Sequence, residues 1–199
     1  MTTFADLYEQ FKNSPLHVKR NAVRDAVLKA TGAQRVHIHA ATMNTTVCRG
    51  MYFSPRNATH GLDAYVGQHV IAISRDLNTC WSRMVIVKEL MHMLDGADSA
   101  TDSGEAFERV FSELNGVSNA QQQSPQSHAE VRAFWMALAI LVPENHRVRL
   151  KASWLSDQRE PTAKNFAVAK ELLIPAIHVP RLFGPQYERI LESLVAGQF

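Results

Sequence analysis

The hydrophobic positions of this chain change from helical spacing to strand spacing and back again. Residues 4–11 and 17–31 repeat apolar side chains every three or four positions, which predicts two amphipathic helices. Residues 35–40, 46–53 and 68–74 alternate or run apolar over short lengths, which predicts three strands. Because the connections between these strands are short, we expect a small sheet that is antiparallel or mixed.

The second half of the chain has mainly helical spacing. Helices are predicted at residues 83–95, 104–114, 128–141, 163–173 and 184–195. Residues 115–127 are polar, which predicts a loop that could border a site. The fold class we expect is α+β, with helices packed on the sheet. Residues 1–145 would form the main domain, and residues 146–199 a helical C-terminal extension on the same core.

Composition limits the classes of function. A length of 199 residues suits one domain, and Lys plus Arg exceed Asp plus Glu by only 21 − 19 = 2, so charge does not indicate nucleic-acid binding. Cys48 and Cys80 do not form a C-x-x-C pair and are expected to be reduced thiols. The start of the chain lacks signal-peptide features, and no apolar run could span a bilayer, so we expect a cytoplasmic protein without a membrane partner.

The predicted helix at residues 83–95 carries an unusual set of ionisable residues. Lys88, Glu89, His92 and Asp95 recur at helical steps, so they share one face of a mostly apolar helix. The nearest known pattern is H-E-x-x-H, in which two histidines one turn apart bind zinc and the glutamate activates water. In this chain a lysine, Lys88, replaces the first histidine.

A second motif lies downstream, where Glu130 is followed by Ala133, Ala137, Leu141 and Pro143. Together with the K-E-x-x-H segment and a further match at residues 169–182, it resembles the ImmA/IrrE-type metallopeptidases over roughly residues 68–182. The resemblance implies a zincin-like fold and a cytoplasmic setting among mobile-element or stress regulators. Such proteins often act on a helix-turn-helix repressor, so a protein or peptide partner is expected.

Carried over by position, the resemblance makes His92 and Glu130 metal ligands and Glu89 the general base. A catalytic zinc needs three protein ligands, and the ammonium of Lys88 has no lone pair at a usual pKa of about 10.4. We therefore expect weak zinc binding or none. One hypothesis is a catalytically impaired binding or regulatory protein, in which Lys88 replaces the charge of zinc by pairing with Glu130 or Glu89.

Three alternatives remain open from the sequence. The protein could be an active peptidase in which His128 or Asp95 completes the ligand set. The charged stripe could be a set of salt bridges on an exposed helix face. Residues 165–182 could form a DNA-binding helix-turn-helix, although the second helix carries Arg181 as its one cation, so nucleic acid is not the expected partner.

Overall fold

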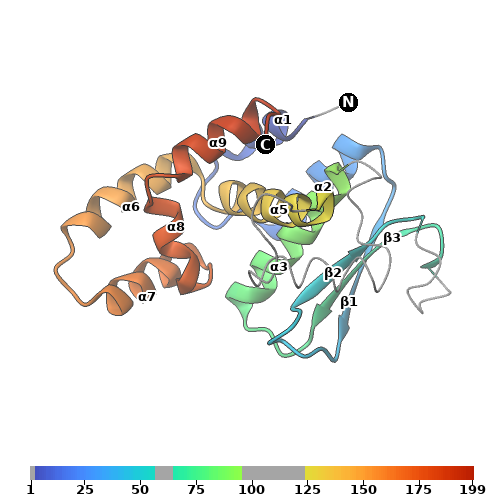
Figure 1. Cartoon of the computed structure of the whole chain (residues 1–199), viewed down its shortest axis with the longest axis horizontal. Coiled ribbons are helices and arrows are strands. Elements are labelled where there is room, and N and C mark those ends of the chain that lie inside the picture. The colour runs from blue at the N-terminus through green and yellow to red at the C-terminus, as the bar shows by residue number, and fades with distance from the viewer. Residues whose placement is uncertain (1–2, 57–64, 96–123) are drawn as a thin grey trace.

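The computed structural model describes residues 3–56, 65–95 and 124–199, and it confirms an α+β fold. In Figure 1, helix α5 (Pro125–Leu141) crosses the middle of the molecule, with the sheet on one side and the C-terminal helices on the other. The predicted helix at 104–114 and the predicted loop up to residue 123 lie outside the described residues.

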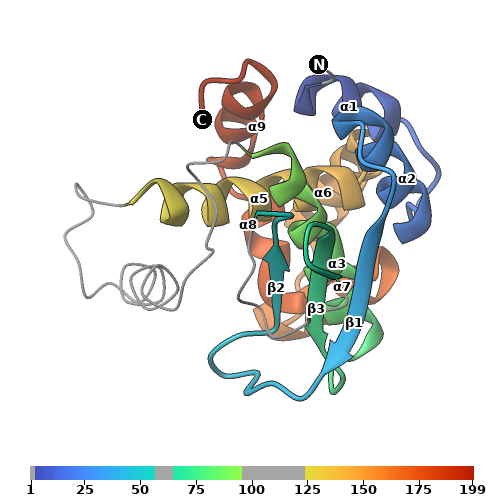
Figure 2. The same ribbon diagram turned by 90° about the vertical axis from the view of Figure 1, so that its right-hand side faces the viewer.

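The sheet is mixed. Its strands in the described part of the chain are β1 (Val36–Ala41), β2 (Gly50–Phe53) and β3 (His69–Ser74). The order is β1-β3-β2, as Figure 2 shows. β1 runs parallel to β3, with Val36 opposite His69, whereas β2 runs antiparallel to β3, with Gly50 opposite Ile73. A purely antiparallel sheet was therefore the wrong alternative, because the last strand inserts between the two earlier ones.

Strand β2 is shorter than predicted and lies very close to a helix. A turn precedes it, in which the side chain of Asn44 accepts hydrogen bonds from the backbone N–H and the hydroxyl of Thr46. A Cβ atom on Gly50 would lie 2.3 Å from Val85 Cγ1, so glycine allows the strand to approach the helix. This close packing places β2 beside the helix with the charged stripe.

Before its C-terminal part, the chain contains helices α1 (Phe4–Phe11), α2 (Arg20–Thr31), α3 (Thr79–Met91) and α5, and the short 3-10 turn η2 (His92–Leu94) continues α3. Helix α3 packs on the sheet, α2 and α5 pack against α3, and α1 packs against α5 and α2. Asn78 caps α3, its side chain accepting from the backbone N–H of Trp81 at 3.0 Å. Helix α5 starts at Pro125, not at His128, because Ser124 caps it and proline suits the first helical position. The end of the predicted loop was therefore wrong.

The C-terminal part of the chain is helical. It contains α6 (Glu144–Ser156), α7 (Pro161–Leu172), the turn η5 (Ala176–His178), α8 (Val179–Phe183) and α9 (Tyr187–Val195). The hydrophobic pattern missed α6, which buries little besides Arg147 and Leu150. The expected boundary after residue 145 falls in the first turn of this helix. The candidate recognition helix of the helix-turn-helix alternative corresponds to α8, which has only 5 residues and buries Val179 and Leu182.

One partly buried arginine connects these parts of the molecule. The guanidinium of Arg83, on α3, donates hydrogen bonds of 2.9–3.3 Å to the carbonyl groups of Leu172, Leu173, Val18 and Leu141. Three of these carbonyls lie at the C-terminal ends of α5 and α7, where backbone acceptors have no partner within the helix. Arg83 therefore fixes α3 to both helices. No helix in the described ranges is long and apolar enough to cross a membrane.

Candidate functional site

The charged residues of the two sequence motifs meet between α3 and α5. Lys88, in the last turn of α3, places its Nζ 2.9 Å from Glu89 Oε1 and in even closer contact with Glu130 Oε2 on α5. Glu89 is only 2% exposed, and Lys88 and Glu130 are 19% and 22% exposed. The alternative of salt bridges on an exposed helix face was therefore wrong. One ammonium group bridges two carboxylates at a largely buried position.

His92 also belongs to this group, and its two ring nitrogens contact different partners. Its Nδ1 lies 2.8 Å from Asp95 Oδ2, and the other oxygen of Asp95 contacts Arg132. Its Nε2 faces the carboxylates, 3.2 Å from Glu130 Oε1 and 3.9 Å from Glu89 Oε2. A carboxylate on one ring nitrogen that orients the other nitrogen is the usual support of a metal-binding histidine. Asp95 thus occupies the position of an orienting partner.

His128, the other suggested substitute ligand, lies apart from this group. It is exposed on α5, two residues before Glu130, and its side chain has no contact with Lys88, His92 or Glu130 among the interactions of the described residues. Two positions along a helix are separated by about 200° around its axis, so the two side chains point in different directions.

Charge pairing determines the protonation state of the cluster. Burial disfavours the charged form of His92, but the charge of Glu130 and the hydrogen bonds to Asp95 and Glu130 together outweigh burial and raise the pKa of His92 to about 9. Burial likewise opposes the charge of Lys88, but Glu130 and Glu89 outweigh burial and raise its pKa. Burial would raise the pKa of Glu130, yet Lys88 and His92 hold it well below its usual range. At neutral pH both Lys88 and His92 are therefore cations, and Glu130 is an anion.

This donor set does not fit a catalytic zinc. Such a zinc needs three protein ligands and one open position. Of the residues assigned by the resemblance, only His92 and Glu130 could coordinate, and the ammonium of Lys88 already occupies the space between the carboxylates. Across the described ranges, no group of three His, Cys, Asp or Glu side chains converges in a way that could hold a metal ion.

A hollow of about 460 Å³ opens beside the cluster. Its lining residues are Lys88, Glu130, Val131, Phe134, Trp135 and Arg181. Phe134 follows Glu130 by one helical turn, so α5 supplies both a charged and an aromatic wall. The sequence motifs did not identify Phe134 or Trp135 as residues of a site. The signal that could have identified them is the presence of two large aromatic side chains in an otherwise alanine-rich helix.

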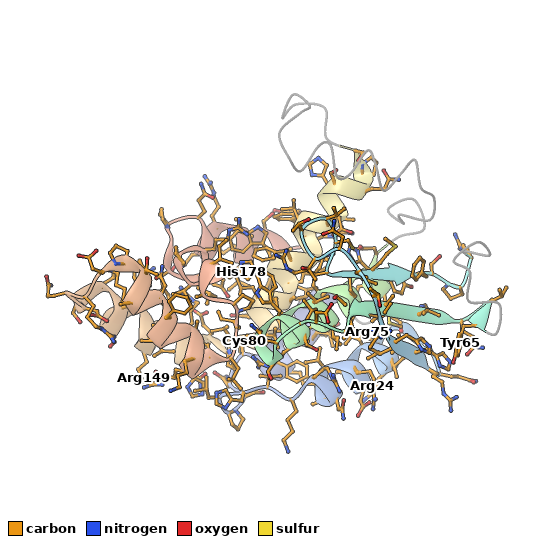
Figure 3. The ribbon with its side chains drawn as sticks, turned by 90° about the horizontal axis from the view of Figure 1, so that it is seen from below. Arg24, Tyr65, Arg75, Cys80, Arg149 and His178 are labelled. Atoms are coloured by element: carbon orange, nitrogen blue, oxygen red, sulfur yellow. The ribbon has the colours of Figure 1, made fainter. Side chains whose placement is uncertain are left out.

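A row of aromatic and cationic side chains continues from Phe134 and Arg181 in the wall of this hollow. The ring of His178 lies 5.4 Å from that of Trp81 and 4.9 Å from that of Phe134. The guanidinium of Arg49 lies 4.2 Å from the centre of the Trp81 ring, and that of Arg181 lies 5.1 Å from the centre of Phe134. Burial, together with the charges of Arg181 and Arg49, lowers the pKa of His178 to about 4. Figure 3 shows His178 toward the middle of the molecule.

Cys48 lies close enough to the charged cluster for its titration to be affected. Its Sγ donates to the carbonyl of Gly50 at 3.0 Å. Burial raises the pKa of this thiol, and the charge of Glu89 adds to the effect. A neutral thiol is a weak nucleophile, so Cys48 is not suited to nucleophilic catalysis at neutral pH.

No protein-family model, curated protein or solved structure matches this chain.

Proposed function

We propose that this protein is an ImmA/IrrE-like metallopeptidase homologue whose zinc site has degenerated, and that it binds a protein or peptide instead of cleaving one. A single observation carries the proposal. The ammonium of Lys88 lies between the carboxylates of Glu89 and Glu130, at the motif position where the family has its first zinc-binding histidine.

The geometry around Lys88 supports this origin. Two carboxylates buried side by side require a cation, and an ammonium group meets that need where a zinc ion would otherwise do so. An ordinary salt bridge between α3 and α5 would not also require His92 to face Glu130 with Asp95 behind it. A zinc site that lost one ligand accounts for all four residues together.

The chemistry of the cluster argues against hydrolysis. An ammonium group is not a Lewis acid and does not lower the pKa of a bound water as zinc does. The carboxylate of Glu89 is paired with Lys88, so it is not free to accept a proton from water. The alternative of an active peptidase with substitute ligands gains no support, because His128 is exposed and Asp95 is bonded to His92 and Arg132.

The proposed setting is cytoplasmic, and the proposed partner is a protein or peptide such as a helix-turn-helix repressor. Both follow from the resemblance to the family. A nucleic-acid partner is not part of the proposal, since α8 buries Val179 and Leu182 and exposes few cations.

Metal analysis of protein purified without chelator tests the proposal. We expect substoichiometric zinc or none in both the natural protein and the matched control Lys88→Gln, and stoichiometric zinc in Lys88→His, because only histidine restores the third ligand. Adding Glu130→Ala to Lys88→His should remove the metal again. Stoichiometric zinc in the natural protein that disappears in Glu130→Ala would overturn the proposal.

A peptidase assay provides an independent measurement. Cleavage of an unstructured protein such as casein should be no faster with the natural protein than with Glu89→Gln, since neither has an activated water. Cleavage that depends on Glu89 would contradict the loss of catalysis even if little zinc were found.

A further inference from the structure

The hollow beside the charged cluster contains two cations with different surroundings. Lys88, at one end, is already paired with the carboxylates of Glu89 and Glu130. Arg181, from α8, is exposed and forms no ion pair with any residue in the described parts of the chain. Its positive charge is therefore available to a ligand, whereas that of Lys88 is not.

The guanidinium of Arg181 is also well placed to bind an anion. It lies over the ring of Phe134, at 5.1 Å from the ring centre. Stacking on an aromatic face orients the planar guanidinium and leaves N–H groups at its edge free to bind a carboxylate with two hydrogen bonds. Phe134 itself is packed against His178, so its ring does not move freely.

The remaining walls are apolar. Val131, Phe134 and Trp135 line the hollow between Glu130 and Arg181. An anion would be repelled by the carboxylate of Glu130, so it is expected at the Arg181 end. A volume of about 460 Å³ is within the usual range for ligand pockets and is enough for one or two amino-acid residues.

We infer that this hollow binds the C-terminal residue of a peptide, with the terminal carboxylate on Arg181 and an apolar last side chain against Phe134, Trp135 and Val131. A C-terminal residue carries its carboxylate and its side chain on the same Cα atom. This matches a pocket in which the cation lies directly over an aromatic wall. An internal Asp or Glu brings a carboxylate without an apolar group on the same residue. The inference rests on the proposed function, because it names the kind of partner that the groove takes.

Calorimetric titration with short peptides tests the inference. The probes are acetyl-Gly-Gly-Phe and acetyl-Gly-Gly-Leu with a free carboxylate, the same peptides as C-terminal amides, and acetyl-phenylalanine. The free acids should bind, and each amide should bind at least about tenfold more weakly, because a charge-assisted pair of hydrogen bonds is lost. Acetyl-phenylalanine should bind more weakly than the tripeptide. Equal binding by acid and amide, tighter binding of acetyl-phenylalanine, or no binding of any probe would overturn the inference.

Matched variants locate the effect. Arg181→Gln should weaken the free acids about tenfold and leave the amides unchanged, so that the preference for the carboxylate disappears. Arg189→Gln, at an exposed arginine of α9, is the control and should change neither. An Arg181→Gln variant that still prefers the free acid would contradict the assignment. These outcomes are separate from the zinc measurements, since stoichiometric zinc in the natural protein would overturn the proposed function without affecting binding that depends on Arg181.

Discussion

His92 and His178 are almost equally buried, at 9% and 8% exposed, yet their acid–base properties differ in opposite directions. The pKa of His92 is raised to about 9, and that of His178 is lowered to about 4. Burial disfavours the charged imidazolium in both cases. The difference therefore comes from the neighbours, which are carboxylates around His92 and aromatic rings with arginines around His178.

The same two helices build both surroundings. α3 carries Trp81 near its start and Lys88 in its last turn, and α5 carries Glu130 and Phe134 one turn apart. The hollow lies between the charged end and the aromatic end. Changing one group at either end should therefore show how independent the two environments are.

The largest effect is expected when the cation of the charged cluster is removed. Lys88→Met leaves the carboxylates of Glu89 and Glu130 close together without an ammonium group. Breaking a buried ion pair from one side costs about 3–5 kcal/mol. Urea unfolding at pH 7 should show a loss of free energy of unfolding in that range.

Two further variants serve as controls for the loss of stability in Lys88→Met. The double variant Lys88→Met with Glu130→Gln should recover part of the loss, because the unpaired charge is also removed. Lys12→Met breaks the exposed pair of Lys12 and Glu9 and should cost less than about 1 kcal/mol. If Lys88→Met were no more destabilising than Lys12→Met, the ion pair would not be important for stability.

The two histidines should shape the pH dependence of stability in opposite ways. The raised pKa of His92 adds stability that is fully present below about 6.5 and is lost as pH rises through about 9. The lowered pKa of His178 adds stability that is present above about 6.5 and is lost as pH falls toward about 4. Each difference is roughly 2.5 pH units, or about 3–4 kcal/mol at about 1.4 kcal/mol per unit.

Urea unfolding between pH 4 and pH 9 should therefore show maximal stability near pH 6.5. His92→Gln should flatten the alkaline side, and His178→Phe the acid side down to about pH 4.5, where protonation of Glu130 begins to reduce stability in all variants that retain it. The assignment would be contradicted if His92→Gln flattened the acid side, if His178→Phe flattened the alkaline side, or if neither variant changed the profile of stability against pH.

The smallest effect is expected at the aromatic end. Arg181→Gln removes one of the two cations that disfavour protonation of His178, so its pKa should rise by less than about one pH unit, since Arg49 and burial remain. NMR titration of the imidazole signals would measure this rise. The pKa of His92 should not change in the same variant; a shift of similar size would show that the two environments are coupled.

Several features of the fold follow from local patterns in the sequence. Helical spacing identified α1, α2 and α5, and the glycine at position 32 ends α2 with φ +72° as expected for a C-terminal cap. The strand order did not follow, because it depends on which strand inserts between two others. Helix α6 was missed because its one strongly buried apolar residue is Leu150, and the buried charge of Arg147 does not register as a hydrophobic position.

For the candidate site, local spacing in the sequence was enough to identify which residues belong together. The spacing of Lys88, Glu89 and His92, and the motif that begins at Glu130, selected a group separated by about forty positions along the chain. The contacts that these side chains make with one another depend on how the helices pack. The tertiary structure placed the ammonium of Lys88 between two carboxylates, put Asp95 behind His92, and brought Arg181 onto Phe134. Such contacts depend on the packing of α3, α5 and α8, which no local spacing specifies.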